Sequence, residues 1–268
     1  MLKTLFLMSI LVLRVAAYVD EDMDGVDDSY DRCLQTPFTD LVNSDGCSVE
    51  SLVSMHHYSL KTGMSYSDTD YNTLSKTDTV VSSIELDYYY KNFSLGVSTS
   101  YYANESEEYS GSGMNDSFLG VGYSLNLEKL LLNLEMSIIL PTYETPYNNN
   151  NTDYSSSLSA SYSFEELTLF ATYGFTLVND DDVQNIASYQ NSSYISGGLG
   201  YYLSPKLYLS ISYNESDSIY KNVTKINTAS LYSYYSIDER LFVTVNYAYG
   251  LSESASDNYM AFKIGYYY

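Results

Sequence analysis

Bulky apolar or aromatic residues alternate with small polar ones along most of the chain after residue 55. The clearest example is the series Leu130, Leu132, Leu134, Met136 and Ile138. A period of two is typical of β-strands whose two faces meet different surroundings. The same pattern predicts further strands over 84–90, 93–101, 119–127, 158–164, 167–175, 199–203, 207–213 and 241–249.

Two kinds of connection alternate between these segments. Tight turns are predicted at 91–92, 128–129, 165–166, 204–206 and 238–239, and longer polar loops at 104–115, 141–152, 179–191 and 215–222. This alternation is typical of an up-and-down β-barrel. A first strand near 58–66, a tenth around 229–237 and a last near 259–268 bring the count to about twelve, which places both chain ends on the side of the short turns. The segment 229–237 alternates poorly, so we expect a β-bulge there.

The first residues are typical of an export signal. Lys3 precedes an apolar run from Leu5 to Leu13, and small residues ending at Ala17 offer a cleavage site, so 1–17 is predicted to be removed. No later segment approaches the ~18 apolar residues of a membrane-spanning helix. The protein is therefore either soluble outside the cytoplasm, for example as a β-sandwich, or crosses a membrane as a closed barrel.

Composition favours strands and polar loops over packed helices. The chain has 33 Tyr, no Trp and only 4 Pro. Its 34 acidic and 12 basic residues give a formal charge of -22, which argues against nucleic acid as a partner, because phosphate binding needs clustered Lys and Arg. For most of the acidic residues we favour solvated loops over a cation site.

The last strand carries an independent signal. Met260, Phe262, Ile264, Tyr266 and Tyr268 alternate up to an aromatic final residue. In this it resembles bacterial outer-membrane barrels in general. The resemblance implies recognition of the C-terminal strand by the barrel assembly machinery and insertion into the outer-membrane lipid bilayer. The predicted fold is all-β: a transmembrane antiparallel up-and-down barrel over 55–268, after a short N-terminal module over 18–50.

Carboxylates are spaced regularly near the predicted mature N-terminus. Counted from Asp20, oxygen-bearing side chains fall at positions 1, 3, 5, 9 and 12, with Gly25 at position 6. Calcium takes six to eight oxygen ligands, and a glycine at this point permits the sharp turn around the ion. The alternative is a disordered acidic linker. The predicted calcium ligands are Asp20, Asp22, Asp24, the Val26 carbonyl, Asp28 and Asp31.

This stretch resembles the thrombospondin type 3 repeat, whose pattern is D-x-D-x-D-G-x-x-D-x-x-D-x-C. The matching residues are Asp20, Asp22, Asp24, Gly25, Asp28, Asp31 and Cys33. The continuation to Cys47 is similar to the linker in the outer-membrane protein A family. The resemblance covers about 30 residues and implies a structural calcium ion.

Cys33 and Cys47 are the two cysteines of the chain. In an exported protein such a pair favours a disulfide over a metal site, which would need further ligands at matched spacing.

If the apolar face of each strand contacts lipid, small polar residues line the lumen. The predicted lining is Ser94, Gly96, Ser98, Ser100, Gly120, Gly122, Ser124, Ser155, Ser157, Ser159, Ser161, Gly198, Gly200, Ser210 and Ser212. Eight-stranded barrels are filled by side chains, whereas sixteen-stranded ones leave a channel, so about twelve strands with this lining predict a narrow water path.

Five charged residues interrupt this lining: Lys61, Glu85, Asp87, Glu135 and Lys263. All but Glu135 belong to the first, second and last strands, which meet where the barrel closes. Two interpretations are open and compatible. The charges form salt bridges that hold the closure together, or they form a constriction that selects solutes by charge.

Two functions from different classes remain. The first is a passive channel for small hydrophilic solutes, and the second is a structural or adhesion protein that acts through its external loops. The position of 18–55 relative to the lumen would discriminate between them. An enzyme is disfavoured, because the two histidines, His56 and His57, adjoin the first strand without a motif such as G-x-S-x-G.

Overall fold

The computed structural model describes residues 22, 26, 31–33, 36, 40–51, 55–70, 76–107 and 109–268. The predicted export signal lies outside this set. The chain divides into two compact units, Met1–Met55 and His56–Tyr268. Among the described residues, no helix is long and apolar enough to cross a membrane.

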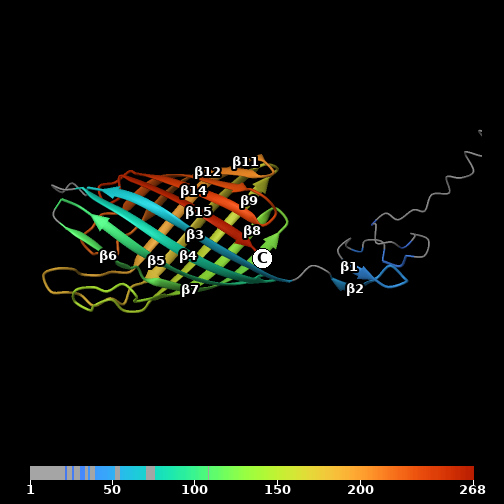
Figure 1. Ribbon diagram of the computed structural model, residues 1–268, viewed down its shortest axis with the longest axis horizontal. Helices are drawn as coiled ribbons and strands as arrows, with labels where there is room; N and C mark the ends of the chain where they lie inside the picture. Colours follow the sequence, from blue (N-terminus) through green and yellow to red (C-terminus); the bar gives the residue numbers. More distant parts are fainter. Residues whose placement is uncertain are drawn as a thin grey trace, which may run out of the picture. The chain divides into compact units, whose positions relative to one another are not determined.

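The second unit is a closed antiparallel β-barrel (Figure 1). Apart from β6 and β7, which both pair with β5, each strand pairs with its neighbours in sequence, and β15 pairs with β3 to close the sheet. The strands are β3 (His56–Thr69), β4 (Thr77–Tyr90), β5 (Phe93–Glu105), β6 (Ser110–Met114), β7 (Ser117–Leu127), β8 (Leu130–Leu140), β9 (Asp153–Phe164), β10 (Leu167–Leu177), β11 (Ser192–Ser204), β12 (Leu207–Ser216), β13 (Ile226–Ser236), β14 (Leu241–Gly250) and β15 (Asn258–Tyr267).

Strands β6 and β7 occupy one position in the barrel. Both pair with β5, β6 along 101–105 and β7 along 93–98, and the register shifts by one residue between them. Asn115 and Asp116 form the interruption. The 13-stranded sheet is therefore a barrel with twelve strand positions, which confirms the predicted fold class.

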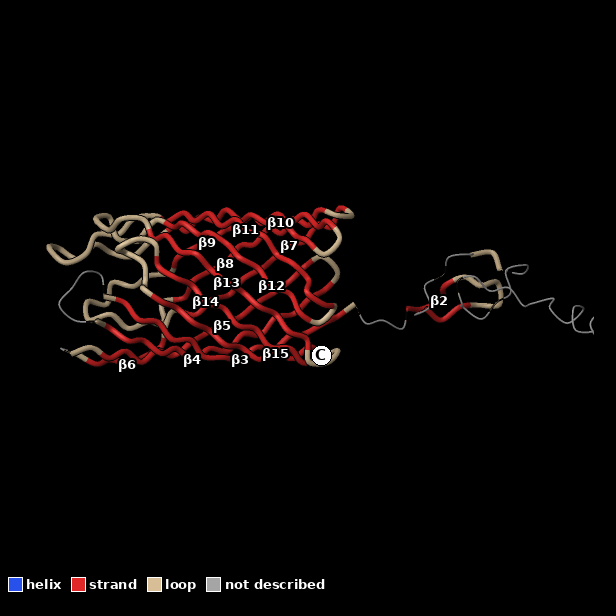
Figure 2. Tube along the Cα trace, turned by 90° about the horizontal axis from the view of Figure 1, so that it is seen from above, coloured by secondary structure: helices blue, strands red, loops and turns tan. Residues whose placement is uncertain are grey.

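Short turns gather at one end of the barrel and long loops at the other (Figure 2). The tight turns fall where they were predicted, and three of them hold a non-glycine residue in the left-handed region: Lys91, Glu128 and Glu165, with φ between 52° and 54°. The predicted loop at 104–115 is mostly wrong. There β5 continues to Glu105 and pairs with both β4 and β6, because the Ser and Gly residues of β6 continue the hydrogen-bonding ladder on the second side of β5.

The expected bulge in 229–237 is also wrong. Strand β13 pairs with both neighbours without a register shift. Its alternation is weak because Tyr232 and Tyr234 lie on the lumenal face, where the other strands mostly carry small residues. A register shift does occur between Tyr202 and Ser204 of β11, next to a tight turn.

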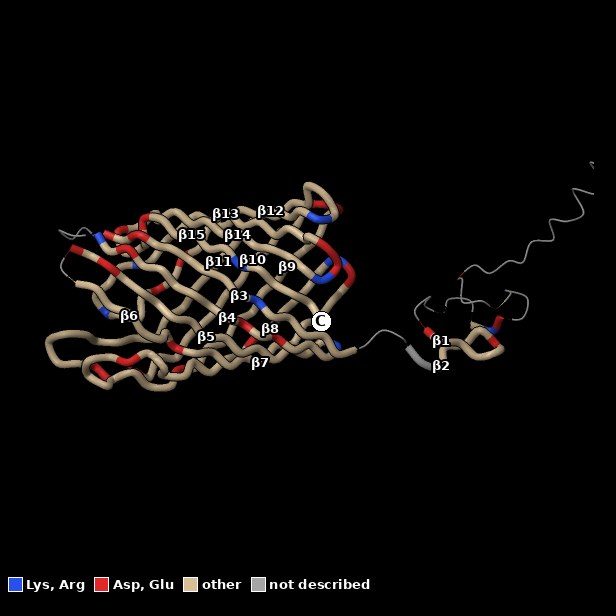
Figure 3. The backbone as a smooth tube through the Cα atoms, viewed as in Figure 1, with Lys and Arg blue, Asp and Glu red and all other residues tan. Residues whose placement is uncertain are grey.

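The exterior of the barrel is apolar between its two ends. Large outward side chains such as Val121, Met136 and Ile211 are 55–58% exposed. Charged residues concentrate at the two ends and leave a belt nearly free of them (Figure 3). Water contact over such a belt would be unfavourable by about 25 cal/mol per Å². A closed barrel also pairs its backbone groups internally, so this unit is built to span a lipid bilayer.

The N-terminal unit contains a two-stranded hairpin, β1 (Asp40–Val42) and β2 (Ser48–Ser51), whose turn uses Gly46 at φ 74°. The predicted disulfide between Cys33 and Cys47 is present. Thr36 connects the segments: its hydroxyl donates to the carbonyl oxygen of Gly46 at 2.6 Å, and its N–H donates to a carboxylate oxygen of Asp22 at 2.7 Å. A bridge and a few buried hydrogen bonds thus hold this short unit together.

The two faces of β8 offer a direct test of this orientation. Met136→Arg places a charge on the lipid face in the middle of the strand, and we expect it to lower the free energy of unfolding by about 2–4 kcal/mol. Ser137→Arg, one residue along and facing the lumen, should cost much less. Urea unfolding of the two variants in lipid vesicles compares them, and equal losses would contradict the assignment of faces.

Candidate channel lumen

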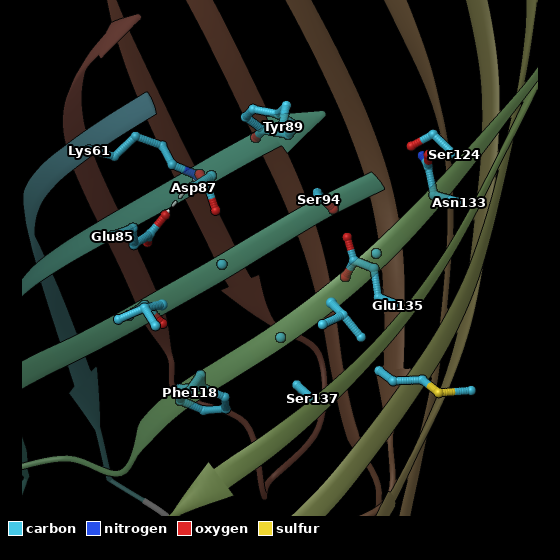
Figure 4. Close-up of a pocket in the computed structure, with 17 residues that line it drawn as sticks. Lys61, Glu85, Asp87, Tyr89, Ser94, Phe118, Ser124, Asn133, Glu135 and Ser137 are labelled. Carbon is cyan, nitrogen blue, oxygen red and sulfur yellow. Dashed lines mark ion pairs between the residues drawn. The ribbon is translucent and has the colours of Figure 1, made fainter. Parts of the chain in front are cut away.

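A hollow of about 520 Å³ lies inside the barrel along β4, β5, β7 and β8 (Figure 4). Its walls are mostly small or polar. The predicted lining residues that border it are Ser94, Gly96, Ser98, Gly120, Gly122 and Ser124. Alternation therefore placed these residues on the correct face, and the small side chains leave the space that a larger lining would fill.

An ion-pair network lies on the lumenal face where the barrel closes. Lys61 Nζ lies 2.9 Å from Glu85 Oε2 and 3.1 Å from Asp87 Oδ2. Lys263 pairs with the other oxygen of Glu85, and the Ser59 hydroxyl donates to Asp87 at 2.9 Å. The charged side chains are 21–32% exposed. The network thus connects β15, β3 and β4, as the salt-bridge interpretation requires.

Gly63 allows Lys263 to take part in this network. Lys263 lies on β15 and its partner Glu85 lies on β4, so its side chain must cross β3. Gly63 is opposite Lys263 on β3, and a Cβ there would overlap Lys263 and the backbone of Phe262. The absence of a side chain at this one position opens the path for the lysine.

Glu135 is separate from the other four charges. It comes from β8 and borders the same hollow, farther round the wall (Figure 4). Among the described residues, it takes part in none of the ion pairs. Two lysines and three carboxylates therefore give the five lumenal charges a formal sum of -1, and Glu135 is the carboxylate that the network does not neutralise.

Aromatic side chains also border two further hollows in the lumen, and they were not among the predicted lining residues. A second hollow of about 320 Å³ is bordered by Tyr89, Tyr232, Tyr234, Phe242 and Tyr267. A third, of about 600 Å³, is bordered by Phe170 and Tyr208 and again by Tyr232. The alternation along each strand could have predicted them. Each of these residues is an odd number of positions from an outward-facing residue of its strand and must therefore face the lumen.

The external loops form a polar rim with internal contacts. The Asp182 carboxylate accepts a hydrogen bond from the Tyr189 N–H at 2.7 Å and pairs with Lys221 at 3.2 Å, and these contacts lower its pKa. Burial, together with the nearby carboxylates of Asp116 and Asp181, raises the pKa of Asp180. Neighbouring loops are therefore connected through their acidic residues.

His56 lies at the start of β3, where its Nδ1 is 2.7 Å from the Tyr88 hydroxyl and its ring is 4.9 Å from that of Tyr90. His56 therefore belongs to an aromatic cluster of the kind that gathers at the edges of the apolar belt in outer-membrane barrels.

Of the predicted calcium ligands, only Asp22, Val26 and Asp31 are among the described residues. Oδ1 of Asp31 accepts a hydrogen bond from the Cys33 N–H at 2.7 Å. Its Oδ2 is buried and has no hydrogen-bond partner within the described part of the chain. A buried carboxylate oxygen without a partner is costly, and a cation would compensate for that cost. In the same part of the chain, no group of three or more His, Cys, Asp or Glu residues is arranged to hold a metal ion.

Comparison with known proteins shows a likeness of fold. No protein-family model and no curated protein sequence matches this chain. An outer-membrane channel from Pseudomonas putida F1 superposes with a TM-score of 0.65 at 13% sequence identity, over 80% of this chain and 95% of that one. The NanC porin superposes with a TM-score of 0.53 at 12% identity, over 77% and 97%. The barrel thus has the architecture found in outer-membrane channels and porins.

Removing Glu85 tests the structural role of the network. In Glu85→Ala, Lys61 keeps its pair with Asp87, whereas Lys263 loses the one carboxylate with which it pairs among the described residues. We therefore expect the free energy of unfolding to fall by about 1–3 kcal/mol, less than for a fully buried pair because water reaches these groups. Glu135→Ala, which breaks no ion pair, is the matched control. Urea unfolding in vesicles measures both, and an equal loss in the two variants would argue against a stabilising network.

Proposed function

We propose that this protein is a passive channel for small hydrophilic solutes in the bacterial outer membrane. The observation that carries the proposal is a series of adjacent hollows inside the barrel. The first and second hollows share Lys61, Glu85 and Tyr89, and the second and third share Tyr232 and Asn246. The polar lining suits water and dissolved solutes. The apolar exterior and the likeness to outer-membrane channels support the location.

The lumenal charges favour a modest preference for cations. Four of them balance within the network, and Glu135 remains as a single carboxylate on a wall of Ser, Gly and Asn. A charge in a narrow pore with low-dielectric walls acts on passing ions more strongly than the same charge in open water.

Planar-bilayer recordings of the refolded protein test this function. We expect ohmic single-channel steps and a reversal potential in a salt gradient that indicates cation preference. Glu135→Gln should reduce that preference and Glu135→Lys should reverse it, because the substitution changes the sign of the net lumenal charge.

Glu166→Gln is the matched control, since it removes the same charge from a tight turn. If it shifted the reversal potential as much as Glu135→Gln, the selectivity would not arise at Glu135. The absence of any conductance from correctly folded protein would exclude the channel.

We also propose that the N-terminal unit binds one calcium ion in a structural role. The spacing of carboxylates from Asp20 to Asp31 supports it, as does the buried Oδ2 of Asp31, which has no hydrogen-bond partner among the described residues. Asp22 would contribute a carboxylate ligand, and it already accepts a hydrogen bond from the Thr36 N–H. Asp20, Asp24 and Asp28 lie outside the described residues, and their part rests on the sequence pattern. A bound ion would offset the repulsion among these carboxylates.

Titration calorimetry of the full chain with calcium tests the site. We expect one site per chain, with affinity at least tenfold weaker in Asp31→Asn, because a neutral amide replaces a charged ligand. Asp45→Asn, in the same unit but outside the ligand pattern, should bind as the unmodified protein does. A single calcium site that Asp31→Asn leaves unchanged would place the ion elsewhere.

A further inference from the structure

Six aromatic side chains form one side of the lumen near the short-turn end of the barrel. They come from β10, β12, β13, β14 and β15 and border the second and third hollows. We call them the aromatic wall: Phe170, Tyr208, Tyr232, Tyr234, Phe242 and Tyr267. The opposite side, along β5 and β7, carries mostly Ser and Gly, with Phe118 as its one aromatic residue on the first hollow, so the lumen has two chemically different sides.

Rings of the aromatic wall lie across neighbouring strands and leave the space in front of them open. Phe170 occupies the space above Gly198, Tyr208 that above Gly200, and Phe242 that above Gly265. A Cβ at any of these glycines would overlap the ring. The side chains are thus held against the sheet, which explains how large residues and a hollow of about 600 Å³ coexist.

Three of the rings also stack against one another. The Phe242 ring centroid lies 5.2 Å from that of Tyr234 and 4.7 Å from that of Tyr267, with interplanar angles of 30° and 29°. Phe242 itself is only 4% exposed. Contacts of this kind restrain the rings, so the surface that they present is already formed before any solute arrives.

The third hollow combines these rings with uncharged hydrogen-bonding groups. Apart from Phe170, Tyr208, Tyr232 and Ala248, it is bordered only by hydroxyl and amide side chains, namely Ser210, Ser212, Asn214, Thr228, Ser230 and Asn246. Some of these are positioned by each other: Asn214 donates to Ser230 at 2.9 Å and accepts from Ser196 at 2.6 Å. Among the described residues, no carboxylate, amine or guanidinium borders this hollow, so its known lining offers no counter-charge to an ionic solute.

A neutral sugar matches this lining. Its C–H faces can lie on aromatic rings while its hydroxyls exchange hydrogen bonds with Ser, Thr and Asn. A purely apolar solute would leave the hydroxyl and amide groups without partners, and an ion would lose its hydration without gaining a charged partner. The two hollows, about 320 and 600 Å³, fall in the range of roughly 300–1,000 Å³ typical of small-molecule sites.

We propose that the aromatic wall is a binding surface for neutral saccharides, so that sugars are among the solutes of this channel. The proposal rests on the channel function above and adds a substrate class to it. Saccharides would bind weakly in the third hollow, beside Phe170, Tyr208 and Tyr232. They would pass from there to the second hollow, where Lys61, Glu85 and Lys263 are paired with one another.

The test is block of the single-channel current by maltotriose, a neutral trisaccharide. We expect block that saturates with concentration. Trigalacturonate, an acidic trisaccharide, and a polyethylene glycol of equal mass should block at least fivefold less well. Equal block by the glycol would show that only size matters, and equal block by the acid would show that neutrality does not, so either result would overturn the proposal.

Variants locate the effect. Tyr208→Leu should raise the half-blocking concentration about 5–10-fold, through loss of one ring contact, while Tyr208→Phe keeps the ring and should retain most of the block. Tyr194→Leu is the matched control: Tyr194 also lies over a glycine, Gly174, but outside the aromatic wall. A loss of block in Tyr194→Leu equal to that in Tyr208→Leu would overturn the assignment to this wall.

Calorimetry with maltotriose separates this proposal from the channel itself. The protein could bind maltotriose, lose that binding in Tyr208→Leu, and yet show no conductance. That result would support the saccharide surface and exclude the channel. Conductance with neither block nor binding would leave the channel standing and exclude the saccharide surface. Urea unfolding of each variant checks that a change in binding does not come from a loss of folded protein.

Discussion

The need to pair every backbone N–H and C=O group inside a lipid bilayer determines this structure. A sheet can meet that need only by closing on itself, which here depends on pairing the last strand, β15, with the first, β3. The closing strands carry the densest set of lumenal ion pairs, with Lys61, Glu85 and Lys263 on three adjacent strands. Strands β3 and β15 are far apart in sequence, so the loop-closure entropy opposes their pairing more than that of any other two neighbouring strands. Charge complementarity on the inner face gives that pairing a specific register.

Closure also divides each strand into two unlike faces, and this division is what could be predicted from the sequence. Leu130 to Ile138 had to be a strand because its apolar residues recur every second position, and 91–92 or 128–129 had to be turns because the alternation breaks there. The strand count followed from these two signals, and the closed barrel with twelve strand positions agrees with it.

The errors have a common physical origin. Tyrosine suits both lipid-facing girdles and a water-filled lumen, because it has an apolar ring and a polar hydroxyl. Tyr232 and Tyr234 therefore looked like a break in the pattern of β13, although they continue it on the inner face. Likewise, the Ser and Gly residues of 110–114 are as common in loops as in strands. Only the partner, β5, shows that they continue the ladder.

The lumenal site was predictable in part for the same reason. Lys61, Glu85, Asp87, Glu135 and Lys263 were recognised because charge on an alternating strand can only face inward. Their separation into a neutralised network and a lone Glu135 depends on distances across strands, which local pattern does not contain. The pairs of an aromatic ring and a glycine are even harder to predict from the sequence. The role of Gly265 becomes clear only when the structure shows that Phe242 lies beside it. Small residues thus have two uses in this barrel. On β5 and β7 they widen the lumen directly, and on β11 and β15 they make room for rings that line it.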